Sequence, residues 1–188
     1  MKATRLKVEY LNAPIGIDVV KPRFFWNCDG GEKQTAYQII CKRAGETVWN
    51  SGKVESASMT RISYEGKPLR SRDVTTWAVK LWDEHGNGGE IASSRFEIGL
   101  LEASDWKAKW ITGNYSVNPL NRYPVDCFRK RFDTADIAEA RLYITACGVY
   151  EAKINGKRCG DFVLAPGVTD YRKRIQYQTI HVTDLLKA

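Results

Sequence analysis

Short alternating runs of apolar and polar residues, separated by turn-forming residues, constrain the fold of this sequence more than any other feature. Apolar side chains recur at every second position over Thr35 to Lys42 and over Thr75 to Asp83, as they do in strands with one buried face. Glycine, proline, asparagine and aspartate lie between the runs, and no segment sustains an apolar repeat of 3.6 residues. The pattern is typical of an all-β fold.

The first hundred residues hold seven such runs, which predict an immunoglobulin-like or fibronectin type III sandwich over residues 1–102. Trp26 and Trp77 share a face with aliphatic neighbours, so we expect core positions for both rather than sugar stacking. Trp82 has the opposite register and is predicted to pack against the next module. The runs are Arg5 to Tyr10, Arg23 to Asn27, Thr35 to Lys42, Val48-Trp49, Thr60 to Tyr64, Thr75 to Asp83 and Ile91 to Ile98.

A second β module is predicted over residues 103–188. Trp106 and Trp110 follow the boundary and are expected to pack between the modules. Asn155-Gly156 is a strong type I′ hairpin signal, and Thr183 is predicted to cap a short helix. The predicted strands are Cys127 to Phe132, Ala140 to Cys147, Tyr150 to Ile154, Arg158 to Leu164 and Arg174 to Val182.

Five cysteines and the lack of a long apolar run indicate the environment that the sequence suits. The cysteines are scattered and form no C-x-x-C pair, which favours reduced thiols over a disulfide framework or a metal site. Cys41 and Cys147 lie among apolar neighbours and are expected to react slowly. No stretch approaches the roughly 20 apolar residues of a membrane span, and the first residues are too charged for a signal peptide. We therefore expect a cytoplasmic protein with no cofactor, metal or membrane partner.

The net charge of +7 raises the question of a nucleic-acid partner. Residues 1–104 carry 15 basic and 13 acidic side chains, and residues 105–188 carry 14 and 9. The excess lies mainly in two triplets, Arg129-Lys130-Arg131 and Arg172-Lys173-Arg174. Both triplets fall in predicted strands, where alternate side chains point to opposite faces, so neither forms a continuous basic stripe. Solvated strand faces, and no nucleic-acid partner, are the expectation.

Several segments are weak signals one by one and specific as an ordered set. They are P-R-F-F-W (22–26), A-Y-Q-I-I (36–40), V-W-N-S-G-K-V (48–54), Y-E-G-K-P-L (64–69), W-A-V-K-L-W-D (77–83), F-E-I-G-L-L (96–101), D-W-K-A-K-W-I (105–111), and the two stretches 146–160 and 164–186. Together they resemble the amino-terminal region of bacterial α-L-rhamnosidases. In that family a fibronectin-like domain leads into a jelly-roll sandwich, and a helical barrel further along the chain performs the hydrolysis. The resemblance implies a fibronectin-like sandwich followed by an incomplete jelly roll.

The resemblance also implies a reaction for which this sequence has no credible residues. The family removes terminal α-linked L-rhamnose with inversion, which requires one carboxylic acid to protonate the leaving oxygen and one carboxylate to activate water. Those groups belong to the barrel, and its motifs do not occur here. We therefore predict no catalytic residue. The acids of the second module fit solvated or capping carboxylates instead, namely Glu151, Asp161, Asp170 and Asp184.

The sequence thus predicts a non-catalytic, amino-terminal fragment of an α-L-rhamnosidase that packs against the catalytic barrel of the parent enzyme. One rival is a free-standing carbohydrate-binding module, for which Asn155 is the candidate contact. A second rival is a fibronectin-like scaffold that binds another protein. Because a jelly roll cut halfway leaves an unpaired strand edge, we also expect a homo-oligomer through residues 126–188.

Overall fold

The computed structural model describes residues 1–118 and 120–186, and it separates into two compact units, Met1–Asp105 and Trp106–Ala188. Pro119, Lys187 and Ala188, all in the predicted second module, lie outside the described residues. Regular structure is almost entirely β-strand, which confirms the predicted all-β class.

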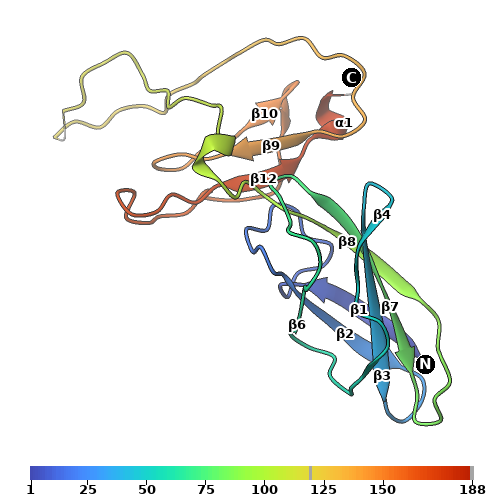
Figure 1. The fold of residues 1–188 in the computed structure, drawn as a ribbon. Helices are drawn as coiled ribbons and strands as arrows, with labels where there is room; N and C mark the ends of the chain where they lie inside the picture. The colour runs from blue at the N-terminus through green and yellow to red at the C-terminus, as the bar shows by residue number, and fades with distance from the viewer. Residues whose placement is uncertain (119, 187–188) are drawn as a thin grey trace. The chain divides into compact units, whose positions relative to one another are not determined.

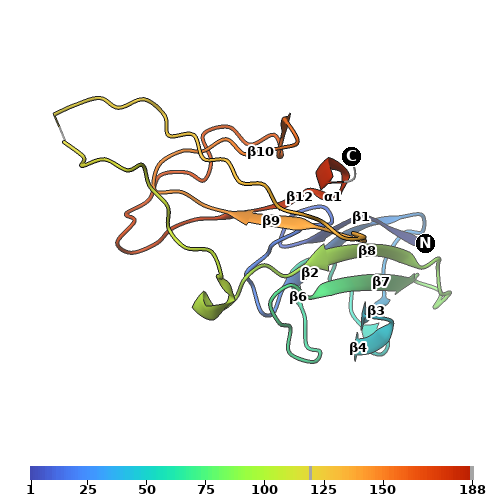
Figure 2. The same ribbon diagram turned by 90° about the horizontal axis from the view of Figure 1, so that it is seen from above.

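The first unit is built from two antiparallel sheets (Figures 1 and 2). One sheet has the order β1-β2-β6, with β1 over Lys2–Val8, β2 over Arg23–Asp29 and β6 over Ile62–Ser63. The other has the order β4-β3-β7-β8, with β4 over Glu46–Asn50, β3 over Ala36–Arg43, β7 over Val74–Trp82, β8 over Ala92–Glu97, and β5 over Val54–Glu55 pairing with β3. All seven predicted runs overlap one of these strands.

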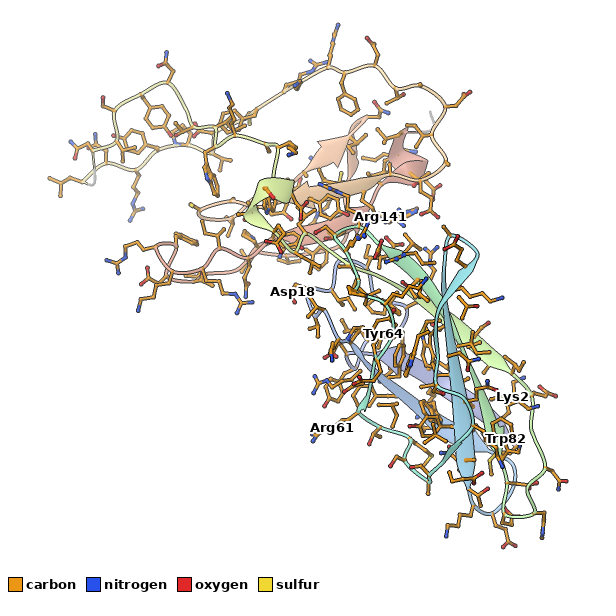
Figure 3. The ribbon with its side chains drawn as sticks, viewed as in Figure 1. Lys2, Asp18, Arg61, Tyr64, Trp82 and Arg141 are labelled. Carbon is orange, nitrogen blue, oxygen red and sulfur yellow. The ribbon has the colours of Figure 1, made fainter. Side chains whose placement is uncertain are left out.

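Aromatic side chains fill the space between the two sheets. Trp26 and Trp77 are 2% and 1% exposed, which confirms their predicted core positions. Phe24 lies with its ring centroid 4.6 Å from that of Trp77 and 6.0 Å from that of Phe96. Tyr64, labelled in Figure 3, donates a hydrogen bond from its hydroxyl to the Lys67 carbonyl oxygen, and burial raises its pKa to about 12. Large buried rings of this kind supply most of the hydrophobic stabilisation of a small sandwich.

A buried amide connects this core to an irregular loop. Gln34 is 4% exposed, and its Oε1 accepts a hydrogen bond of 2.9 Å from Trp26 Nε1. Its Nε2 donates to the carbonyl oxygens of Ser56 and Ser58, each at 3.0 Å. The side-chain amide thus connects a buried ring of the core to the backbone of the loop at two points.

The second unit contains less regular structure. Its strands form two pairs, β9 (Arg141–Ile144) with β12 (Gln178–His181) and β10 (Lys153–Ile154) with β11 (Lys157–Arg158). The helix α1 covers Thr183–Leu186 with Asp184 in its first turn. The small buried core of the second unit consists of Cys159, Ile180 and Val182.

The predicted strand over Cys127 to Phe132 is not formed. A strand needs a neighbour for its backbone N–H and C=O groups, and none of the residues that the structure describes pairs with this segment in a sheet. The triplet Arg129-Lys130-Arg131 therefore lies in extended, exposed chain, and Arg172-Lys173-Arg174 lies at a turn where Arg172 pairs with Asp170. The strand assignment was wrong for both triplets.

The cysteines follow the expected burial only in part. Cys41 is buried, and desolvation raises the pKa of its thiol to about 12, so it should react slowly as predicted. Cys147 is exposed, so the same expectation for Cys147 was wrong. It follows the end of β9, where the alternation that the sequence suggested stops. Cys159 is buried instead.

Candidate functional site

The structure places Glu151, Asp161, Asp170 and Asp184 at exposed positions of the second unit. A general acid at neutral pH needs a raised pKa, whereas a hydrogen bond from Lys153 lowers the pKa of Glu151. A hydrogen bond from the Arg172 guanidinium lowers the pKa of Asp170 in the same way. Asp161 is exposed, and Asp184 lies in the first turn of α1, where a carboxylate is favourable beside the helix amino terminus. Glu151 and Asp170 thus lie in surface ion pairs, Asp161 is solvent-exposed, and Asp184 lies at a helix start.

Asn155 forms the β10–β11 turn, as the sequence predicts. Its φ of 51° and the φ of 77° at Gly156 are those of a type I′ turn. The side-chain Nδ2 donates a hydrogen bond of 2.9 Å to the Leu185 carbonyl oxygen and so ties the turn to α1. One amide hydrogen is thus already used, and a carbohydrate contact through Asn155 remains a prediction.

The three tryptophans predicted to pack between the modules lie in different settings. Trp82 ends β7, and the Lys80 and Lys53 ammonium groups lie 5.2 and 5.4 Å from its ring centroid (Figure 3 labels Trp82). Trp106 is half-buried, with its ring edge-on to Tyr177 of the same unit at 5.3 Å. Trp110 is 65% exposed. Their role between the modules remains a prediction.

The second unit has an uncovered apolar surface, whose individual residues were not predicted from the sequence. Large apolar side chains are strongly exposed along 117–132 and 162–168, among them Val117, Leu120, Val125, Phe128, Phe132, Val163, Leu164 and Val168. Leu120 and Val125 are 92% and 89% exposed. These side chains therefore lack the cover that apolar residues have in a protein core.

The segment 127–132 belongs to this surface. Phe128, Lys130 and Phe132 alternate with Cys127, Arg129 and Arg131, so in an extended chain the two phenylalanines share one face. The alternation of side chains was the sequence signal for a strand in this segment. Such alternation predicts a strand correctly only where a neighbouring strand is present.

Neither a metal site nor a membrane-spanning helix is found within residues 1–118 and 120–186. Within these ranges no three or more histidine, cysteine, aspartate or glutamate side chains gather in a way that could hold a metal ion. In the same part of the chain, no helix has the length and apolar character to cross a membrane.

Comparisons with known proteins point to one family. Residues 3–102 match the model of the Rha78A-like, N-terminal immunoglobulin domain, and residues 135–188 match that of the alpha-L-rhamnosidase N-terminal domain. An alpha-L-rhamnosidase of Formosa agariphila is 40% identical over 93% of this chain and 21% of its own length.

Solved structures show the same relationship. The alpha-L-rhamnosidase from Dictyoglumus thermophilum has a TM-score of 0.82 and 33% identity over 97% of this chain and 23% of its own. The native enzyme from Aspergillus terreus has a TM-score of 0.80 and 30% identity over 98% of this chain and 22% of its own. The chain therefore spans about a fifth of the length of the relatives that it matches.

Proposed function

The chain belongs to the α-L-rhamnosidases and corresponds to their N-terminal region, and on that premise we propose that it is a non-catalytic structural part of such an enzyme. The observation that carries the proposal is the match of both units to N-terminal domains, on relatives that are four to five times longer. Its work is to pack against the catalytic part and to hold the domains in a fixed geometry.

The uncovered apolar surface of the second unit supports this role. A β-sandwich needs both faces and both edges covered, and the exposed rings of Phe128 and Phe132 lack such cover among the residues that the structure describes. In the proposed whole protein, further strands complete a jelly roll over this surface and a catalytic barrel packs beyond it.

The proposed parent enzyme hydrolyses terminal α-L-rhamnosides with inversion in the cytoplasm. An inverting reaction places its acid and base about 6.5–9.5 Å apart, so that a water molecule fits between the base and the sugar. In the proposal both groups belong to the catalytic part of the parent enzyme, and the lowered pKa values of Glu151 and Asp170 suit neither of them to the role of the acid.

A domain exchange tests the structural role. In the Formosa agariphila α-L-rhamnosidase, the region that matches this chain is either deleted or replaced by residues 1–188. We expect the deletion to yield aggregated or inactive protein, and the replacement to restore hydrolysis of an aryl α-L-rhamnoside. A deletion variant that stays soluble and fully active would contradict the proposal.

Titration of the chain with L-rhamnose in a calorimeter separates the proposal from a free-standing carbohydrate-binding module. The structural role predicts no heat of binding, whereas saturable binding would favour the carbohydrate-binding module. Capture of a separate protein partner without any sugar binding would favour an interaction scaffold.

A further inference from the structure

The last residues of the first unit are held against a loop of the same unit by side-chain hydrogen bonds. Ser71 Oγ accepts a hydrogen bond of 2.8 Å from the Leu101 backbone N–H and donates one of 2.5 Å to Asp105 Oδ2. The same Asp105 oxygen accepts the Glu102 backbone N–H at 3.0 Å. Asp105 ends the short 3-10 helix Ala103–Asp105, whose turn is closed by the Asp105 N–H on the Glu102 carbonyl oxygen. One serine and one aspartate thus fix the backbone of residues 101–105.

Arg72 adds a second set of bonds to the same segment. Its Nη2 donates to the Asp105 carbonyl oxygen at 3.0 Å, and its backbone N–H lies 3.2 and 3.0 Å from the carbonyl oxygens of Ile98 and Gly99. The φ of Arg72 is 67°, in the left-handed region that residues with a Cβ rarely adopt. A conformation of this kind persists only where the surrounding bonds determine it.

The loop that carries Ser71 and Arg72 is itself anchored to the sheet. Asp73 Oδ2 accepts hydrogen bonds from Arg43 Nη1 of β3 at 2.5 Å and from the Arg70 backbone N–H at 2.7 Å. The Ile98 backbone N–H donates to the Asp73 carbonyl oxygen at 2.9 Å. The bonds therefore run without a break from the sheet through residues 70–73 to residues 98–105.

We propose that Ser71, Arg72 and Asp105 form a linker latch, which makes residues 99–105 a rigid strut and gives the chain one fixed direction as it leaves the first unit. The alternative is a flexible tether, whose end samples many directions. The latch deepens the proposed structural function, on which its biological purpose rests. A domain that sets the geometry of an enzyme needs a rigid backbone segment at the point where the chain leaves it.

The test measures backbone order by NMR relaxation in the full chain. Rigid backbone has an order parameter of about 0.85, and flexible backbone falls below about 0.6. We expect the amides of residues 100–105 to show the rigid value in the unchanged chain. Asp105→Ala, which removes the acceptor for Ser71 and Glu102, should lower them to the flexible range.

Two further variants make the result specific. Ser71→Ala removes the hydrogen bond to the Leu101 N–H without changing charge, and it should lower the order parameters of the same amides. It keeps the test decisive even if Asp105→Ala does not fold. Glu102→Ala is the control, because it removes a neighbouring carboxylate but leaves the Glu102 backbone N–H on Asp105. Flexible values in the unchanged chain, rigid values in both latch variants, or an equal loss in the control would each overturn the latch. None of these results bears on the domain exchange, so the two proposals can fail separately.

Discussion

At the scale of single residues, the buried amide of Gln34 is the clearest case of one side chain holding a loop. Gln34→Leu keeps the volume but leaves Trp26 Nε1 and two backbone carbonyl oxygens without the partners that Gln34 provides. Each buried group without a partner costs about 1–3 kcal/mol. We expect the free energy of unfolding, measured with urea, to fall by about 3 kcal/mol.

Gln38→Leu is the matched control for this change. The Gln38 side chain is half-buried on β3 and bonds only to the Asn50 side chain among the contacts described, at 2.9 Å. The loss of this hydrogen bond in Gln38→Leu should lower the free energy of unfolding by less than about 1 kcal/mol. Equal losses for the two variants would show that the Gln34 amide contributes no more than a surface amide.

Glu9 gives the first unit a pH dependence of definite sign. Its carboxylate accepts hydrogen bonds from Arg23 Nε at 3.0 Å and from Nη2 at 2.6 Å, which hold its pKa below the ordinary value of 4.5. A lowered folded pKa contributes stability above the unfolded pKa and loses it as the pH falls through the folded value. We expect the free energy of unfolding to decrease as the pH is lowered below about 4.5.

The contribution of Glu9 appears as a difference between variants. In Glu9→Gln the free energy of unfolding should decrease less over the same pH range, since the titrating carboxyl group is gone. Glu46→Gln changes an exposed glutamate and should retain the decrease. Identical pH profiles for Glu9→Gln and the unchanged chain would contradict this account.

Asn155 separates a structural role from sugar binding. Asn155→Ala places a Cβ-bearing residue without a side-chain amide at φ 51° and removes the bond to the Leu185 carbonyl oxygen. We expect it to destabilise the second unit by about 1–2 kcal/mol. Asn155→Gly tolerates the positive φ and should recover part of the loss. Calorimetry with L-rhamnose should give no signal for any of the three chains. Binding by the unchanged chain that both Asn155→Ala and Asn155→Gly abolish would identify a sugar contact.

At the scale of elements, strands could be predicted from the sequence where a pairing strand lies among the described residues. Trp77, Val79 and Leu81 alternate on β7, and β3 and β8 pair with it on either side. The same alternation around Phe128 and Phe132 forms no strand, because the pairing partner is missing from residues 1–118 and 120–186. A side-chain pattern predicts which face is buried, but pairing also depends on chain that lies far away in sequence. The latch around Asp105 was not predictable, since hydrogen bonds between 71 and 105 leave no periodic signal.

The unpaired segment predicts self-association through residues 126–188. Exposed strand-like backbone with an apolar face tends to pair with another copy. We expect sedimentation across a concentration series to show oligomers of the full chain, and the double change Phe128→Lys and Phe132→Lys to reduce them.

Val149→Lys is the control for this experiment, because it adds a charge at an exposed apolar residue outside the segment. A chain that stays monomeric at every concentration would show that the second unit closes on itself.

At the scale of the whole molecule, two β units without a defined reactive centre account for the proposed function. Fold class and family could be predicted from the ordered segments between Pro22 and Leu186. The lowered pKa values of Glu151 and Asp170 could not be predicted, because they follow from hydrogen bonds with Lys153 and Arg172 that the sequence does not show.

The most direct test of the central claim is an assay of the purified chain with an aryl α-L-rhamnoside. The account predicts no release of the aryl group above the rate in buffer, because it assigns the acid and base of the reaction to the catalytic part of the parent enzyme. Turnover that disappears when Glu151, Asp161, Asp170 or Asp184 is replaced by its amide would contradict it, and would place the catalytic centre within these residues.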